Sequence, residues 1–590
     1  MTVRHRVVMS PMETMYGTPD GLPSQRTRDY FATRAKGGVG LITLGATGVD
    51  NHHPETPGGL HLATDDAVDA HRALVEVVHE HGAKIQPQIV HSGPDGLGPE
   101  MFGLPSLGPS VIPSYLTGRP STEISKQQLC EVFDLFKAAV RRAAEAGYDG
   151  IELHAAHGYM LLGSFLAPQR NRRTDDYRGD STRGRIRVVL DALAAIRSEV
   201  GDTLPITLRI SGYERVAGGR PIYETARVAS ELVVAGVDAF HVSGGVIDRL
   251  VTGMVNGADD GDEVNVGAAA AVKQAVDVPV IAVGRIHDPV RAEQILADGR
   301  ADFIAMARPL LADPDLPRKL QSGQAHRIRK CISCENCIDS MEQRFSVDCA
   351  INPRTGKERE LAAPRANRAK RVVVIGGGPA GLEAARVAAE RGHHVWLFER
   401  SSQLGGALRW ASVLHAENQP FLRYLRDEIK SSTTKVLLDH AVSAEDVVTQ
   451  APDAVIVATG GHVAVPVIPG ADLPHVYTGP GLRELLGGFN FRAESTDPAW
   501  QRLGASLLAG WRQRLVQPAA VRLATRAGGT RRQLPADCVV LAGTVQPDTT
   551  LFDTLIAAMP GAEVHAAGDC SGLGLIRKAT EEGARAACAI

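Results

Sequence analysis

Four of the eight cysteines lie within 19 residues, at Cys331, Cys334, Cys337 and Cys349. The spacing, C-x2-C-x2-C-x11-C, places three thiols on one tight loop and brings the fourth from a following segment. Four thiolates suit either a zinc ion or an iron–sulfur cluster. Structural zinc usually joins two C-x2-C pairs at a longer separation. Three thiols at three-residue intervals therefore favour a [4Fe–4S] cluster, with zinc and free thiols as the alternatives.

A glycine-rich motif, G-x-G-x-x-G, occupies residues 376–381. It follows an apolar run, Arg371–Ile375, and precedes a helical stretch; a second apolar run, His394–Phe398, ends at Glu399. A strand, glycine turn and helix followed by an acid are typical of a dinucleotide site. The pyrophosphate rests there on the helix N-terminus, and the acid accepts hydrogen bonds from the ribose. A plain tight turn is the alternative.

Two imidazoles and a phenol fall within six residues, at His154, His157 and Tyr159. They follow the apolar run Gly150–Leu153, so we expect them at the end of a strand. Imidazole and phenol groups can hold a carbonyl oxygen and deliver a proton. A lone histidine or tyrosine is usually structural, but three together favour a functional site.

Three arginines also follow short apolar runs, at Arg209, Arg285 and Arg308. Each alone would fit a surface ion pair. Together, at strand ends, they favour binding of a phosphate group and an anionic ring system.

The elements that must position these side chains alternate between apolar β-branched runs and amphipathic helical stretches over residues 1–320. Eight such units predict a (β/α)8 barrel, an α/β fold in which functional side chains gather at the carboxyl ends of the strands. An open doubly wound sheet is the alternative. The predicted strands are Val7–Met9, Gly40–Leu44, Lys84–Val90, Gly150–Leu153, Ile206–Ile210, Ala239–Val242, Val280–Val283 and Phe303–Met306. The helices are expected to begin at Ser24, Asp65, Ser125, Thr182, Tyr223, Gly267 and Asp288.

Composition excludes several classes of protein. The chain has 590 residues, of which 44% are hydrophobic and 22% charged, as in ordinary globular domains. No run approaches the ~18 apolar residues of a membrane span. A net charge of −3 without a basic block argues against nucleic acid as a partner. The first residues lack a secretory signal, so a cytoplasmic location is expected.

These motifs together resemble the flavin and iron–sulfur oxidoreductases that include 2,4-dienoyl-CoA reductase and trimethylamine dehydrogenase, whose barrel is that of the old yellow enzymes. The resemblance covers nearly the whole chain. It is carried by residues 6–12, 34–40, Gln88-x-x-His91, 154–159, Asn171-x-x-Thr174-Asp175-x-Tyr177, 283–285 and 307–311, together with the four cysteines and the glycine-rich motif.

The resemblance implies three cofactors, and we expect the flavin of the barrel and the cluster to occupy separate sites. FMN in the barrel would lie against Pro11, Met12, Gly45, Gln88, Arg209, Gly284, Arg285, Ala307 and Arg308. A [4Fe–4S] cluster would be held by Cys331, Cys334, Cys337 and Cys349. FAD, or ADP alone, would lie against Gly376, Gly378, Ala380, Gly381, Glu399, Gly406, Thr459, Gly460 and Asp569.

The resemblance also implies an activity, that of an ene-reductase or desaturase acting on a C=C bond conjugated to a carbonyl. Hydride would pass through FMN N5, Tyr159 would supply the proton, and His154 with His157 would hold the carbonyl oxygen. Two alternatives stay open. One is a dehydrogenase of amines and related C–N bonds, and the other is a non-catalytic electron-transfer or assembly subunit.

Two departures from the family pattern bear on these alternatives. Glu13 stands where the amine dehydrogenases carry the cysteine that links FMN covalently. All four tryptophans lie after residue 390, so the barrel lacks the aromatic cage that binds substituted ammonium groups. The lack of tryptophan in the barrel, together with His154, His157 and Tyr159, favours the unsaturated carbonyl substrate, and Glu13 predicts that FMN is not covalently bound.

A third departure concerns the electron supply. Relatives insert an NAD(P)H-binding domain where this chain has only about 60 residues, 471–530, without a G-x-G-x-x-G motif. We therefore predict slow direct reduction by NAD(P)H and a protein partner, a ferredoxin or an electron-transfer flavoprotein. A homo-oligomer stays open. The predicted domains are 1–325 for the barrel, 326–370 for the cluster segment, 371–470 with 531–590 for the FAD domain, and 471–530 for the remnant.

Overall fold

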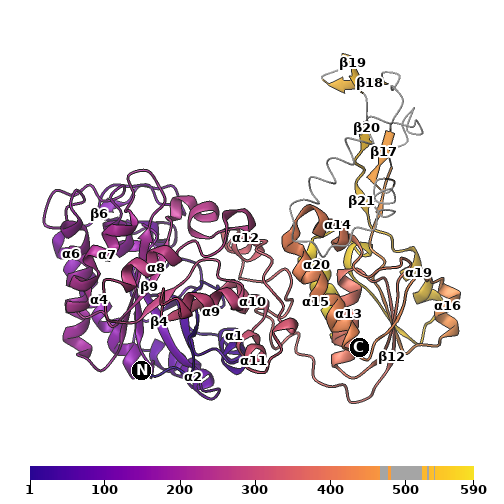
Figure 1. Cartoon of the computed structure of the whole chain (residues 1–590), viewed down its shortest axis with the longest axis horizontal. Coiled ribbons are helices and arrows are strands. Elements are labelled where there is room, and N and C mark those ends of the chain that lie inside the picture. The colour runs from indigo at the N-terminus through magenta and orange to yellow at the C-terminus, as the bar shows by residue number, and fades with distance from the viewer. Residues whose placement is uncertain (466–475, 480, 482–520, 528–529, 537–538) are drawn as a thin grey trace. The chain divides into compact units, whose positions relative to one another are not determined.

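The computed structural model describes residues 1–465, 476–479, 481, 521–527, 530–536 and 539–590. It divides the chain into two compact units, Met1–Ala362 and Ala363–Ile590, each with its own sheet. Figure 1 shows both units with their elements labelled. The predicted remnant of a nucleotide domain, 471–530, falls largely outside the described residues.

The first unit is built on a closed parallel barrel, as predicted. Its strands follow one another around the barrel, and pairing of Val8 with Leu41 between the first two closes the ring. A bulge near Leu44 lets the second strand run further than its apolar pattern suggests. The eight strands are β1 (Val7–Met9), β2 (Leu41–Gly48), β4 (Lys84–Val90), β7 (Ile151–Ala155), β8 (Ile206–Tyr213), β9 (Ala239–Gly244), β10 (Val280–Ala282) and β11 (Phe303–Met306).

Helices follow the strands and cover the outside of the barrel. They are α1 (Gln25–Lys36), α2 (Ala67–His79), α4 (Lys126–Glu145), α6 (Thr182–Val200), α7 (Ile222–Val234), α8 (Val266–Lys273) and α9 (Pro289–Ala297). The short α10 (Arg308–Ala312), directly after β11, is buried along its whole length. Ser24 and Ser125 form capping boxes, and Asp288 accepts a hydrogen bond from the backbone of Val290. Where no side chain caps the helix, as at α2, α7 and α8, the observed start differs from the predicted one by one or two residues.

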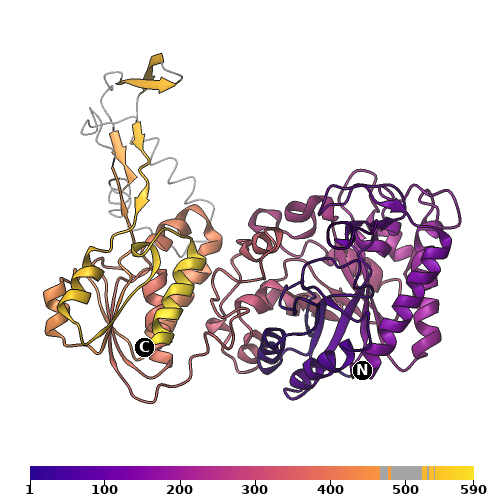
Figure 2. The ribbon, with the colours of Figure 1, turned by 180° about the vertical axis from the view of Figure 1, so that it is seen from behind.

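The second unit is a doubly wound α/β domain (Figure 2). Its parallel strands lie in the order β14 (Lys435–Leu437), β13 (His394–Phe398), β12 (Arg371–Ile375), β15 (Ala454–Val457) and β22 (Glu563–Ala566). The helices α13 (Pro379–Glu390), α15 (Gln419–Lys430) and α20 (Ile576–Ala589) form one contacting group, and α16 (Ala444–Thr449) and α19 (Thr550–Ala558) form another. The central β12 lies between strands reached in opposite directions, which makes its carboxyl end a topological switch point.

No helix in the described part of the chain is both long and apolar enough to cross a membrane.

Candidate active site

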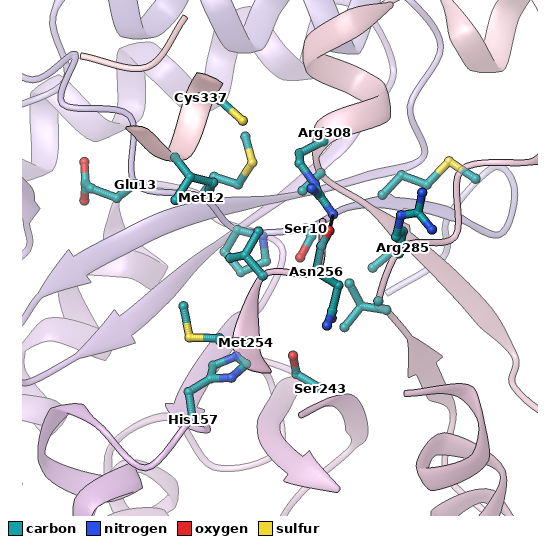
Figure 3. A pocket seen from close by; sticks show the side chains of 18 of the residues that line it. Ser10, Met12, Glu13, His157, Ser243, Met254, Asn256, Arg285, Arg308 and Cys337 are labelled. Carbon is teal, nitrogen blue, oxygen red and sulfur yellow. Dashed lines mark hydrogen bonds between the residues drawn. The ribbon is translucent and has the colours of Figure 1, made fainter. Parts of the chain in front are cut away.

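A pocket opens at the carboxyl ends of the barrel strands (Figure 3). Its wall contains the three predicted catalytic side chains, His154, His157 and Tyr159. It also contains most of the residues predicted to bind FMN, namely Pro11, Met12, Gln88, Arg209, Gly284, Arg285, Ala307 and Arg308. Residues from distant parts of the sequence therefore meet in one cavity.

Gly45 differs from this set, because it does not line the pocket and Ala46 does. A Cβ atom at Gly45 would lie 1.9 Å from the carbonyl oxygen of Met12. Such an approach is closer than any side chain tolerates, so glycine is needed here for packing. Gly45 thus shapes the turn that carries Met12, and the structure does not place it at the cavity wall.

The histidines and the tyrosine form a compact cluster. The ring centroids of His154 and Tyr159 lie 5.3 Å apart, and those of His157 and Tyr159 lie 6.2 Å apart. His157 has a φ of 64°, in the left-handed region that non-glycine residues seldom occupy. This backbone turns the segment after β7 back over the pocket.

The two histidines differ in their hydrogen bonding. Burial lowers the pKa of His154 to about 3 and that of His157 well below its usual value, so both rings are neutral near pH 7. Nδ1 of His157 lies 3.1 Å from the carbonyl oxygen of Gly244, which makes Nδ1 the protonated atom. Among the described residues, neither ring nitrogen of His154 has a partner. His154 is therefore free to donate to a ligand oxygen.

Arginines dominate one side of the pocket. In Figure 3, Arg285 and Arg308 lie together on that side and Glu13 lies on the other. Arg308 donates through Nη2 to the carbonyl oxygen of Asn256 at 2.7 Å, while its Nη1 is buried and unpartnered in the described part of the chain. Arg209 likewise has an unpartnered, buried Nε. Buried guanidinium groups with free donors suit an anionic ligand such as a phosphate.

A polar network beneath the pocket was not predicted. Glu152, fully buried in the barrel, accepts a hydrogen bond from Nε2 of Gln88 at 2.7 Å and another from Nδ1 of His241 at 2.8 Å. Because a carboxylate only accepts, the Gln88 amide is fixed with its oxygen available to the pocket. The only sequence signal was an acid inside an apolar strand, at Ile151-Glu152-Leu153.

The cysteine segment also contributes to the pocket. Cys337, at the start of α12 (Asn336–Glu342), lines the cavity, and Figure 3 shows it beside Met12. The barrel pocket therefore reaches the cysteine loop, so the predicted FMN and cluster sites adjoin; whether they act as separate sites stays a prediction. A sequence pattern cannot reveal this contact, because it depends on how the loop after the barrel folds back over the strand ends.

The cysteine loop offers donors to its sulfur atoms. The backbone N–H of Ser333 lies 3.4 Å from Sγ of Cys331, and Ser333 and Glu335 take positive φ values of 48° and 58° that wrap the loop. In the described residues, the only group of three or more potential metal ligands within 4.8 Å of one another is Asp50, His53 and His91. The cysteine sulfurs are thus spread wider than the ligands of a single zinc ion, whose Zn–S bonds are about 2.3 Å.

In the second unit, the predicted nucleotide-binding residues gather at the carboxyl edge of the sheet. Gly376 has a φ of 107°, and a Cβ at Gly381 would lie 1.9 Å from its carbonyl oxygen, so the turn requires both glycines. A Cβ at Gly378 would meet nothing within 4 Å, which leaves open space at the N-terminus of α13. Glu399 accepts from the backbone N–H of Gly377 at 2.7 Å. Of the remaining predicted residues, Ala380 lies in the first turn of α13, and the others lie at the start of α14 (Ala407–Leu414), after β15 and after β22.

A second cavity adjoins the barrel pocket and was not predicted. Glu13, Ala46 and Glu55 line both cavities. Asp50, His53 and Thr56 line only the second. These residues fall in an irregular loop after β2, where no periodicity marks a buried position.

The chain matches two known protein families and several characterised relatives. Residues 1–327 match the family described as NADH:flavin oxidoreductase / NADH oxidase, and residues 324–419 and 370–486 match the pyridine nucleotide-disulphide oxidoreductase family. The chain is 38% identical to an NADH oxidase of Thermoanaerobacter brockii, over 83% of this chain and 76% of that protein. It is 32% identical to a cinnamate reductase of Clostridium sporogenes, over 80% and 74%.

A solved structure is similar over the whole length. The structure of 2-naphthoyl-CoA reductase in complex with 2-naphthoyl-CoA has a TM-score of 0.88 and 25% sequence identity, covering 100% of this chain and 97% of that one. The order of barrel and nucleotide-binding unit is therefore shared with a reductase of known structure.

Proposed function

The chain belongs to the NADH:flavin oxidoreductase / NADH oxidase family, and we propose that it catalyses reduction, or the reverse desaturation, of a C=C bond conjugated to a carbonyl group. The observation that carries the proposal is the cluster of His154, His157 and Tyr159 in the wall of the FMN pocket. A neutral donor that can hold the carbonyl oxygen stands there beside a phenol that can protonate carbon. The relatives named as cinnamate and 2-naphthoyl-CoA reductases support it, because both names denote carbonyl compounds conjugated to C=C bonds.

The residues of the pocket fit FMN at both of its ends. The free donors of Arg308 suit its phosphate, and Arg209 and the Gln88 oxygen suit its ring system. FMN, when bound, accepts and donates the hydride. His154 holds the substrate oxygen, which places the double bond beside Tyr159, and the Tyr159 hydroxyl gives its proton to the carbon α to the carbonyl.

We assign a [4Fe–4S] cluster to Cys331, Cys334, Cys337 and Cys349. The wide spread of the sulfurs and the backbone donor at Cys331 support a cluster over zinc. Contact of Cys337 with the barrel pocket would bring the cluster next to FMN, so electrons could pass between them without a mobile carrier. In the second unit, Gly376, Gly378, Ala380, Gly381, Glu399, Gly406, Thr459, Gly460 and Asp569 would hold FAD or ADP.

Anaerobic stopped-flow spectroscopy tests the function. Pre-reduced enzyme is mixed with 2-cyclohexenone or cinnamate, and FMN is expected to reoxidise as the double bond is lost. Failure of every conjugated carbonyl, together with bleaching by a secondary amine, would favour the C–N dehydrogenase instead.

The same apparatus tests the electron supply. Slow or absent reduction by NADH and NADPH, with rapid reduction through a ferredoxin or an electron-transfer flavoprotein, is the expected result. The residues on which this prediction rests, 471–530, lie largely outside the described part of the chain, so it stays a prediction. Rapid saturable reduction by micromolar NADH would contradict it.

His154→Ala is expected to weaken binding of 4-hydroxybenzaldehyde by about tenfold or more, and His157→Ala by less. A hydrogen bond to a charged or strongly polarised oxygen contributes about 1.5–3 kcal/mol. His154 has both nitrogens free, whereas the proton of His157 is already given to Gly244. Titration of the FMN absorbance with the ligand measures both affinities. Equal losses in the two variants would contradict this division of roles.

Glu152→Gln is expected to raise the FMN reduction potential and to weaken FMN binding by about tenfold, the equivalent of one charge-assisted hydrogen bond. The substitution removes the anion that lies near Arg209, so the arginine acts more strongly on a reduced, negatively charged ring. It also frees the Gln88 amide to turn. Spectroelectrochemistry and equilibrium dialysis measure the two effects. A potential that falls or stays constant would contradict the proposed positioning.

A further inference from the structure

Glu55 lines both the barrel pocket and the second cavity. The second cavity continues from Glu55 past Asp50, His53 and Thr56. Because His154 and Glu55 both line the barrel pocket, a ligand in that pocket can contact both side chains.

The polar atoms on this side are short of partners. Oε2 of Glu55 is inaccessible to solvent and has no hydrogen-bond partner among the described residues. The same holds for Oγ1 of Thr56, a side chain only 8% exposed. Glu13 differs, because its Oε1 accepts from the backbone N–H groups of Thr14 and Met15, each at 2.8 Å. A buried carboxyl oxygen without a donor is costly, so a ligand that donates to Glu55 would be stabilised.

The electrostatic surroundings of Glu55 also lack compensation. Burial raises its pKa well above the usual value, and the nearby acids Glu13 and Asp95 raise it further. The arginines Arg285 and Arg308 lie on the opposite side of the pocket from Glu13 (Figure 3). The pocket is thus polarised, with cations at one side and acids at the other, and a positive charge placed at the acidic side would lower the pKa of Glu55.

Of the further acids that line the second cavity, Asp20 is exposed to solvent and Asp50 is already paired. His53 Nδ1 lies 2.8 Å from its Oδ2. Asp50, His53 and His91 could be taken for metal ligands, but the backbone N–H of Gly93 donates to Nδ1 of His91 at 3.0 Å. A neutral His91 therefore carries its proton on Nε2, the atom that faces Asp50 at 3.9 Å, and offers no lone pair to a metal there. Glu55 remains the acid with unused capacity.

We propose that Glu55 selects substrates that carry a positively charged nitrogen away from the reacting carbonyl group. The ammonium group would donate to Oε2 of Glu55 while the carbonyl oxygen contacts His154. This inference rests on the proposed function, since it takes the His154 end as the carbonyl site. It narrows the substrate to a cationic, amine-bearing unsaturated carbonyl compound.

Two phenols of matched shape test the proposal on the FMN-loaded enzyme. Tyramine and 4-propylphenol share the phenolic oxygen that would bind at His154. They differ at the end of the side chain, which is an ammonium group in tyramine and a methyl group in 4-propylphenol. Wild-type enzyme is expected to bind tyramine at least about tenfold more tightly, and Glu55→Gln is expected to bring the ratio to about one without changing the affinity for 4-propylphenol. The exposed Glu76→Gln on α2 is the matched control and should keep the wild-type ratio.

Calorimetry in buffers of different ionisation enthalpy supplies a second readout. Because the ammonium group lowers the raised pKa of Glu55, tyramine should release more protons than 4-propylphenol from the wild-type enzyme. From Glu55→Gln the two ligands should release the same number of protons. The wild-type preference should also fall as the pH is lowered. The comparison of tyramine with 4-propylphenol on the wild-type enzyme tests the role of Glu55 even if Glu55→Gln fails to bind FMN.

The outcomes distinguish failure of the carbonyl site at His154 from failure of the role proposed for Glu55. If neither phenol changes the FMN absorbance, the carbonyl site fails, and the proposed function and the Glu55 inference fall together. If 4-propylphenol binds but tyramine is no tighter, or if Glu55→Gln keeps the preference, only the role of Glu55 is overturned.

Discussion

Replacing Tyr159 by phenylalanine is expected to slow the reaction of reduced enzyme with conjugated enones by roughly 10²–10⁴-fold, the usual contribution of a positioned general acid. Burial and the neighbouring Glu55 raise the pKa of Tyr159 well above 10, so the phenol keeps its proton throughout the neutral range. The nearby imidazoles cannot replace it, because burial holds the pKa of His154 at about 3 and that of His157 lower than usual. Among His154, His157 and Tyr159, the phenol is therefore the group we expect to deliver the proton.

Stopped-flow reoxidation with 2-cyclohexenone measures the effect, with FMN content checked by absorbance. Tyr177→Phe is a suitable control, since the Tyr177 hydroxyl donates to Asp191 at 2.9 Å and Tyr177 does not line the pocket. A Tyr159→Phe enzyme that reoxidises at the wild-type rate with every substrate would remove Tyr159 from the mechanism.

The barrel could be predicted from the sequence because each of its strands is a short apolar run followed by polar residues. His154, Arg209 and Arg308 could be recognised for the same reason, since side chains after parallel strands meet at one end of a barrel. Glu152 and His241 escaped recognition because each is a single polar residue inside an apolar run, and their pairing at 2.8 Å exists only once β7 and β9 are brought together by the closed sheet.

Other parts of the site depend on contacts that no local pattern encodes. Glu55 sits in an irregular loop, where an acid is normally solvated, and becomes notable only because the fold buries one of its oxygens. The resemblance implied that Gly45 contacts FMN, yet in the structure its lack of a side chain makes room for the Met12 carbonyl. The same reasoning applies to Cys337, whose place in the pocket arises from the return of the chain over the barrel after β11.

That position of Cys337 makes a comparison of two cysteine variants informative. Cys334→Ala and Cys337→Ala are both expected to reduce the iron content from about four per chain to near zero, because a cubic cluster needs all its thiolate ligands. Cys334 is exposed and does not line the barrel pocket, so Cys334→Ala should leave FMN content and its spectrum unchanged. Cys337→Ala should also perturb the FMN spectrum, since it alters the wall of the FMN site itself.

Iron and zinc analysis of anaerobically purified protein, with visible absorbance and FMN content, measures these outcomes. Cys130→Ala, on the exposed face of α4, is the matched control and should keep full iron. Stoichiometric zinc without iron in the wild-type protein would contradict the cluster. Identical FMN spectra in the two variants would contradict the contact between Cys337 and the flavin site. If Cys337 both holds the proposed cluster and lines the flavin pocket, electron transfer between the two cofactors would need no movement of the second unit.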